Sequence, residues 1–297
     1  MLSQTFRDYE HIIVDDAGDM DISALNNEFS DQRLIFVRNK RSKGAAGAYN
    51  TGIIESKGEF IMFLDDDDEY MPDILQKINV KYSIAGDDLG FIWTGISRIK
   101  DTARGERLIC NLIWPSVFPT VEDGLVAATS IGNGFGVCVR RDCIKETGLY
   151  DETLKVGADT DYLFRLAINY NFCTIPETLV KIHQHSLNQL TGREHNLERM
   201  RIWEIILGRY NDFLQQYHAV YIAHYNSFAD LCYKLKNKKN GRRILLSIIK
   251  KKPLRIRTYV DLISYELIGN DALSRYCGII LSWFKLITGR KKEFACK

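Results

Sequence analysis

The chain has 297 residues, of which 45% are hydrophobic and 26% charged, and its formal net charge at pH 7 is +2. This composition predicts one substantial core and a second, smaller folded unit. The sequence has no internal repeat, no low-complexity tract and no apolar run of the roughly 18 residues that a membrane-spanning helix needs, which excludes repeat and membrane-spanning architectures. No signal-peptide pattern follows Met1, so we expect a cytoplasmic protein.

The first predicted strand contains Ile12, Ile13 and Val14 and ends in two carboxylates, Asp15 and Asp16. A Gly-containing turn follows, and the same order of strand, carboxylates and turn recurs farther along the chain. This repetition predicts a βαβ arrangement, in which the carboxyl ends of parallel strands meet at one edge.

A basic segment and a predicted helix lie between these two strands, in NKRSKGAAGAYNTGIIESKGEF. The helix has apolar positions at Ala48, Ile53 and Ile54. A basic, glycine-containing helix entry can approach phosphates. The segment matches neither the GxGxxG dinucleotide fingerprint nor the P-loop, so it does not identify a ligand by itself.

The second predicted strand, Phe60 to Leu64, is an unbroken apolar run that ends in four consecutive aspartates, Asp65 to Asp68. Such a run is typical of a strand buried on both faces of a parallel sheet. Crowded carboxylates raise one another's pKa unless a cation lies among them, and oxygen ligands suit Mg²⁺ or Mn²⁺. The segment therefore predicts a metal and phosphate site, with a solvated acidic turn as the alternative.

Three segments together resemble the family 2 glycosyltransferases: QTFRDYEHIIVDDAGD, KGAAGAYNTGI and GEFIMFLDDDDEYMPDILQKI. They follow the family order VDD, GxxxARNxGI, FLDxDD, and the resemblance covers roughly residues 3–190. It implies an α/β fold of the GT-A type, with a mostly parallel central sheet that binds a nucleotide-diphosphate sugar and a divalent metal, Mn²⁺ or Mg²⁺. In this resemblance Asp16 holds the nucleobase, Asp66 faces the ribose, Asp67 and Asp65 bind the metal, and Asp68 shapes the turn. Asp15, Lys43, Asn50 and Gly134 complete the implied nucleotide-sugar site.

The predicted catalytic base lies in GLYDETLKVGADTDYLFRLA, which resembles the family stretch GxFDExLxxGEDxDLxLR. The matching base is Asp159, although Ala158 stands where the family usually has glutamate. A sugar transfer needs such a base on the face opposite the leaving diphosphate. The alternative is that Asp159 and Asp161 only stabilise the N-terminus of a helix, which is the role we expect for Asp161.

Other positions depart from the family or extend its pattern. Tyr49 replaces the arginine of the ARN motif, so Arg41 or Lys43 would have to supply that positive charge. Residues 131–144 correspond to the acceptor-side loop, in which Gly132, Gly134 and Gly136 allow close approach of the backbone to a ligand or only form a turn. KIHQHSLNQLT resembles the family ending that closes over the diphosphate, which makes His183 and His185 candidates, with His185 as a further metal ligand.

The family's first strand and most of its first helix have no counterpart before Leu2. That absence suggests a start that is truncated or misassigned. It also raises an alternative function, a catalytically impaired remnant or a scaffold protein. A sugar nucleotidyltransferase is a weaker alternative, because the chain lacks a Gly-rich basic loop after a first strand.

The C-terminal part of the chain differs in charge from the rest. Residues 234–297 contain 17 Lys and Arg against 4 Asp and Glu. We predict a glycosyltransferase domain at residues 1–192 and a basic helical region at 193–297, where apolar residues recur at spacings of three or four: Ile202, Ile205, Ile206, Tyr210 and Phe213. RRILLSIIKKKPLRIR and YCGIILSWFKLITGRKK set apolar stripes beside Lys and Arg, which suits either an anionic membrane surface or a solvated basic face. Nucleic acid is not an expected partner, because its binding signatures are absent.

The sequence thus predicts an inverting glycosyltransferase that moves a sugar, most plausibly from a UDP-sugar, to a hydroxyl of a glycan or lipid-linked acceptor in cell-surface polysaccharide synthesis. The protein is expected in the cytoplasm, with peripheral attachment to the inner face of the plasma membrane as the alternative to a freely dissolved state.

Overall fold

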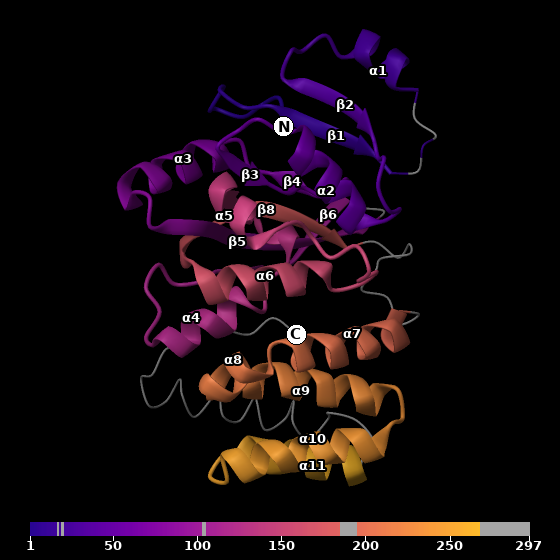
Figure 1. Ribbon diagram of the computed structural model, residues 1–297, viewed down its shortest axis with the longest axis vertical. Coiled ribbons are helices and arrows are strands. Elements are labelled where there is room, and N and C mark those ends of the chain that lie inside the picture. Colours follow the sequence, from indigo (N-terminus) through magenta and orange to yellow (C-terminus); the bar gives the residue numbers. More distant parts are fainter. Residues whose placement is uncertain (17, 19–20, 103–104, 185–194, 268–297) are drawn as a thin grey trace. The chain divides into compact units, whose positions relative to one another are not determined.

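The computed structural model describes residues 1–16, 18, 21–102, 105–184 and 195–267 (Figure 1). Contacts divide the chain into two units, whose described parts are residues 1–184 and 195–267. The boundary predicted between residues 192 and 193 lies outside the described residues and stays a prediction.

The first unit contains two sheets. Strand β1 (His11–Asp15) pairs in parallel with β2 (Leu34–Arg38), and helix α1 (Ile22–Glu28) connects them. The larger sheet has six strands in the order β3 (Phe60–Met62), β7 (Cys138–Arg140), β5 (Leu89–Thr102), β8 (Asn171–Gln184), β4 (Glu69–Tyr70), with β6 (Gly105–Leu112) paired to β5. The helices of this unit are α2 (Ala45–Glu55), α3 (Ile74–Ala85), α4 (Val121–Ala128), α5 (Arg141–Thr147) and α6 (Ala158–Asn169) (Figure 1).

The α/β class is confirmed, but the expected predominance of parallel strands is wrong for the described pairs. Only β1–β2 and β5–β8 are parallel, and the other four pairs are antiparallel. One antiparallel pair is the β5–β6 hairpin, and the others arise where β7 lies between β3 and β5 and where β4 joins β8. The short connection between β5 and β6 permits only antiparallel pairing, whereas the parallel pair of β5 and β8 needs a long crossover.

The strand buried on both faces is β5, not the predicted strand at 60–64. Phe91, Ile92, Trp93 and Ile96 of β5 are completely buried. Ile92 and Ile96 pack in a core with Ile74 and Ile78 of α3 and with residues of β8, whereas Phe91 and Trp93 contact the ring of Phe172. β3 has only three residues and forms an edge of its sheet, because the chain turns after Phe63 to present the aspartates.

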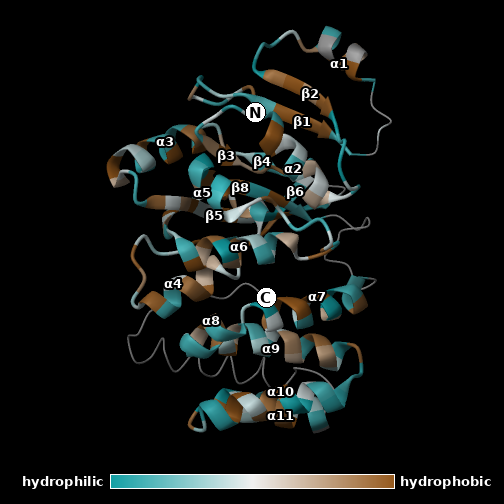
Figure 2. Ribbon diagram, in the orientation of Figure 1, coloured by the Kyte–Doolittle hydropathy of each residue, from teal (hydrophilic) through white to brown (hydrophobic). Residues whose placement is uncertain are grey.

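The second unit is helical in its described part: α7 (Asn196–Arg209), α8 (Asn211–Gln216), α9 (His218–Lys234), α10 (Lys238–Lys251) and α11 (Ile256–Leu267). Ile202, Ile206 and Tyr210 are buried as predicted, but Ile205 is exposed, because it lies off the face that packs. Hydrophobic and hydrophilic residues both occur along α10 and α11 (Figure 2). No helix in the described ranges combines the length and the apolar character needed to cross a bilayer. The YCGIILSWFKLITGRKK segment lies outside those ranges.

Candidate active site

An acidic cluster follows the edge strand β3. A turn closes where the backbone N–H of Asp68 donates to the carbonyl of Asp65 at 3.2 Å. Carboxylate oxygens of Asp65, Asp67 and Asp68 lie within 4.8 Å of one another. Asp66 is exposed and is not part of this group, so its predicted contact with a ribose stays a prediction.

Two carboxyl groups of the cluster, Asp65 and Asp68, have raised pKa values. Loss of water around Asp68 raises its pKa to about 7, because the backbone N–H of His183 compensates only partly and Asp65 and Asp67 add negative charge. Burial, together with Asp67 and Asp66, also raises the pKa of Asp65 against the opposing effect of a hydrogen bond from Tyr49. Three hard oxygen donors at these separations fit a divalent ion such as Mg²⁺ or Mn²⁺. Asp68, predicted only to shape the turn, also belongs to the donor set.

His183 is held by acidic side chains at the cluster's border. Its backbone N–H donates to Asp68 Oδ1 at 3.2 Å, while its ring lies between Asp101 and Glu69, with Nδ1 3.1 Å from Asp101 Oδ1 and Nε2 3.2 Å from Glu69 Oε1. Glu69 and Glu106, whose carboxylates both lie near this ring, also both pair with Lys181. His185 lies outside the described residues.

Asp159, the predicted base, lies in the first turn of α6 and is half-buried. Burial raises its pKa, and the negative charge of Asp65 raises it further, whereas a 2.8 Å hydrogen bond from the Thr160 N–H lowers it. The net direction is upward, toward a better proton acceptor.

The Gly132–Gly134 segment lies between Asp159 and the acidic cluster. A Cβ added to Gly132 would lie 3.0 Å from Asp159 Oδ2, and a Cβ added to Gly134 would lie 3.3 Å from Asp68 Oδ2. A short 3-10 helix (Asn133–Phe135) forms this segment, and Tyr150 anchors it by donating to Asn133 Oδ1 at 3.1 Å. The glycines therefore leave open the space beside both acidic groups, as the backbone-approach interpretation requires.

Asp161, expected to stabilise the N-terminus of a helix, lies in the first turn of α6, and its carboxylate pairs with Arg165 one turn later. It is completely buried, and its carboxylate accepts from Arg165 Nε at 3.1 Å. The Arg165 guanidinium in turn donates to the carbonyls of Thr147 and Leu149. Asp161 thus stabilises the segment that leads into Tyr150 and Glu152.

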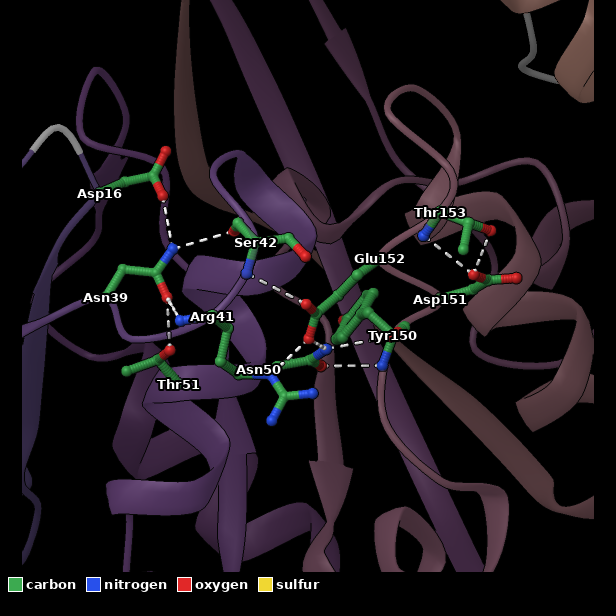
Figure 3. Close-up of polar contacts among 10 residues, drawn as sticks. All are labelled: Asp16, Asn39, Arg41, Ser42, Asn50, Thr51, Tyr150, Asp151, Glu152 and Thr153. Carbon is green, nitrogen blue, oxygen red and sulfur yellow. Dashed lines mark hydrogen bonds and ion pairs between the residues drawn. The ribbon is translucent and has the colours of Figure 1, made fainter.

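The predicted nucleobase residue, Asp16, is half-buried and contacts the loop formed by residues 39–44 (Figure 3). Its carboxylate accepts from Asn39 Nδ2 at 2.6 Å and from the Gly44 N–H at 2.9 Å. Its neighbour Asp15 is buried, accepts from the Gly18 N–H at 2.8 Å and pairs with Arg38, contacts that stabilise the turn. A role for either aspartate in donor binding stays a prediction.

Asn50 is completely buried, and its amide joins α2 to the segment after α5. It donates to the Tyr150 carbonyl at 3.0 Å and to Glu152 Oε1 at 2.7 Å, and its own oxygen accepts from the Tyr150 N–H at 2.8 Å (Figure 3). Both polar atoms of the Asn50 side chain, Nδ2 and Oδ1, thus make hydrogen bonds within the protein. Lys43 is exposed in the 39–44 loop.

Three residues with polar roles were not in the predicted site. Asn39 bonds Asp16, the Ser42 carbonyl and Thr51, and Glu152 bonds Arg41 and Ser42. The Tyr49 hydroxyl donates to Asp65, so tyrosine at this position contacts the acidic cluster although it carries no positive charge. The GLYDETL motif contained a signal for Glu152, but nothing in the sequence places Glu152 beside residues more than a hundred positions earlier.

With this geometry defined, the chain can be compared with known proteins. Residues 1–136 match the sequence model of glycosyl transferase family 2. This part of the chain, which carries Asp16, Asp65 and Asp67, is therefore similar to glycosyl transferase family 2.

Individual relatives agree with that assignment. The chain is 43% identical over 70 residues to the UDP-Glc:alpha-D-GlcNAc-diphosphoundecaprenol beta-1,3-glucosyltransferase WfaP of Escherichia coli, a match that covers 24% of this chain and 28% of WfaP. It is 26% identical over 166 residues to an uncharacterized glycosyltransferase of Haemophilus influenzae, covering 56% of this chain and 54% of that protein. The chain thus spans about half or less of these relatives.

The fold is similar to that of a solved structure. The crystal structure of S. aureus TarS 1–349 in complex with UDP-GlcNAc superposes with a TM-score of 0.60 at 15% identity, covering 99% of this chain and 87% of TarS 1–349. At that identity the similarity establishes the GT-A-type fold alone.

Proposed function

We propose that this protein is an inverting glycosyltransferase that moves a sugar from a nucleotide-diphosphate sugar to a hydroxyl of a lipid-linked saccharide in cell-surface polysaccharide synthesis. The observation that carries this proposal is the placement of Asp159 and the acidic cluster on either side of the Gly132–Gly134 segment. The names of WfaP and the TarS complex favour a UDP-sugar donor, and that of WfaP favours a diphosphoundecaprenol-linked acceptor.

In this mechanism Asp159 accepts the proton of the acceptor hydroxyl while its oxygen forms a bond to the anomeric carbon. The bond from that carbon to the diphosphate breaks, and the configuration inverts. Asp65, Asp67 and Asp68 are the residues that would hold a divalent metal, which when bound would neutralise charge on the departing diphosphate. Asp16 would contact the nucleobase.

Calorimetric titration with UDP, in Mn²⁺ and then in EDTA, tests the donor and metal parts of the proposal. Asp159→Asn should lower transfer by about 10²- to 10⁴-fold while UDP affinity stays nearly unchanged. Asp142→Asn, at an exposed acid of α5, serves as the control and should leave transfer unchanged. Unchanged turnover in Asp159→Asn would remove Asp159 from the mechanism, and a folded parent chain that does not bind UDP would favour the remnant or scaffold alternative.

We also infer that the second unit contacts an anionic membrane surface that carries the acceptor, which would place the protein at the inner face of the plasma membrane. Residues 234–260 contain 11 Lys and Arg and no Asp or Glu. Between α10 and α11, Leu254 is 94% exposed, and Ile256, the first residue of α11, is 74% exposed, with basic residues on both sides. Exposed aliphatic side chains beside cationic groups suit the headgroup region of an anionic bilayer.

A further inference from the structure

The 39–44 loop, between β2 and α2, is held from two directions. On one side Asn39 accepts from the Arg41 N–H at 2.9 Å and donates to the Ser42 carbonyl at 3.0 Å, while Asp16 accepts from the Gly44 N–H. On the other side lies Glu152, which follows α5 in the chain (Figure 3). The loop therefore depends on contacts with residues that are distant in sequence.

Glu152 binds the loop through both carboxylate oxygens. Oε2 accepts from the Ser42 N–H at 3.2 Å, and Oε1 accepts from Arg41 Nε and, at 2.7 Å, from Asn50 Nδ2. Partial burial opposes the charge, but the hydrogen bonds from Asn50, Arg41 and Ser42 outweigh it and lower the pKa of Glu152 to about 2. The carboxylate is thus ionised at neutral pH and fixed by three donors.

Arg41 uses only part of its guanidinium in this arrangement. Its Nε donates to Glu152 in this ion pair, and within the described residues neither terminal nitrogen makes a hydrogen bond. The side chain is 39% exposed. A guanidinium held at Nε keeps both terminal N–H groups available for a bidentate contact with a phosphate.

A positive charge is needed near this loop because Tyr49 stands where the family motif has arginine. Lys43 lies in the same loop but is exposed, and the contacts described for Glu152 involve Arg41. Arg41 is therefore the basic side chain of the loop that the fold orients in advance. Side chains that are already oriented lose less conformational entropy when they bind a ligand.

We propose that Glu152 is a positioning residue of the donor site, which fixes the 39–44 loop and orients Arg41 so that its terminal nitrogens bind the diphosphate of the nucleotide sugar. This inference rests on the proposed function. In this inference Arg41 supplies the positive charge that the family motif has at the position of Tyr49. Glu152 affects donor binding by orienting Arg41.

The test is a double-mutant cycle on UDP affinity, measured by calorimetry in Mn²⁺ with the parent chain, Arg41→Gln, Glu152→Gln and the double variant. Arg41→Gln should weaken UDP binding about tenfold, the effect of one lost charge-assisted contact. Glu152→Gln should weaken it by a smaller factor. In the Arg41→Gln background, Glu152→Gln should add little, because its effect is transmitted through Arg41, whereas a merely structural role would give additive losses.

Glu59→Gln is the matched control. Glu59 also pairs with an arginine, since Arg140 Nη1 lies 2.9 Å from its carboxylate. It stands just before β3 in the chain, whereas Glu152 stands after α5 and contacts the 39–44 loop. The Glu59→Gln substitution should leave UDP affinity unchanged. Melting curves establish that each variant is folded, and Arg41→Gln, at an exposed side chain, tests the inference even if Glu152→Gln unfolds. UDP binding that Arg41→Gln leaves unchanged, or additive losses in the cycle, would overturn this inference alone. A parent chain that does not bind UDP would overturn the proposed donor and this inference with it.

Discussion

At Gly47 the backbone of α2 closely approaches the 39–44 loop. A Cβ at this position would lie 1.8 Å from the Ser42 carbonyl oxygen, a backbone atom. Gly52 lies in the same helix, yet a Cβ there would only make an ordinary 3.6 Å contact with Val14. A side chain at position 47 would therefore collide with the loop, whereas position 52 has room for a methyl group.

Gly47→Ala should lower the free energy of unfolding by about 1–3 kcal/mol, because the loop must move to admit the methyl group. Gly52→Ala, as the control, should raise it by about 0.5–1 kcal/mol through the better helix propensity of alanine. Urea denaturation of both variants gives the comparison. Equal effects of the two substitutions would contradict the close approach described for Gly47.

At the same scale, sequence reasoning pointed to the acidic side chains more readily than to the residues that hold the surrounding loops. Carboxylates of Asp65, Asp67 and Asp68 lie within 4.8 Å of one another, and the charge of Asp65 affects the pKa of Asp159. Asn39 and Glu152 were missed because each is defined by its partners, and Glu152 contacts Ser42 across 110 positions. A single asparagine or glutamate in a loop gives no periodic signal that could predict such contacts.

Helices α7 and α9 meet at a buried histidine. The ring of His224 lies 5.4 Å from that of Trp203, and His224 is only 3% exposed. Burial disfavours the charged imidazolium and lowers the pKa of His224 to about 4. This pairing of helices should therefore weaken in acid.

Between pH 6.5 and 4 the unfolded chain binds a proton at His224 that the folded chain does not, so the free energy of unfolding should fall as the pH falls through this range. Urea denaturation at pH 7 and pH 5 should show a loss about 1–2 kcal/mol larger in the parent than in His224→Gln. The same pH dependence in both proteins would mean that the histidine is not kept neutral by burial.

The sequence predicted the existence of helices and strands better than it predicted their buried faces and their ends. The helix after the 39–44 loop is present as α2, yet Ile54 is exposed while Ile53 is buried. The strand at 60–64 is cut to β3 and lies at an edge, because the partners of a strand are decided by the rest of the sheet. Local hydrophobicity alone does not distinguish an edge strand from a central one.

For the molecule as a whole, charge asymmetry gives the clearest prediction. The chain should sediment with vesicles of phosphatidylcholine and phosphatidylglycerol, and less with phosphatidylcholine alone or at high salt. The triple variant Lys250→Gln, Lys252→Gln, Arg257→Gln should lose about 1 kcal/mol of binding per charge. Leu254→Ser with Ile256→Ser should also weaken binding, because less apolar surface enters the bilayer.

Ile84→Ser is the matched control, since Ile84 is 79% exposed but lies in α3 of the first unit. It should not change vesicle binding. Equal binding to neutral and anionic vesicles would contradict the membrane proposal. So would binding that neither the triple variant nor the Leu254→Ser, Ile256→Ser variant changes. If an oligonucleotide released the bound protein, and if the Leu254→Ser substitution did not change vesicle binding, the partner would be a polyanion instead.

The sequence by itself determined the class of this protein, because the order strand, carboxylates, basic loop and second acidic turn is a local pattern that family 2 motifs share. Only the tertiary structure decided which strands pair and that Asp68 joins the acidic cluster. It also decided that Asn50 joins α2, and Glu152 the 39–44 loop, to the segment before Asp159. The physical reason is range. Motifs report interactions among near neighbours in the chain, whereas the contacts that orient these side chains join residues that only folding brings together.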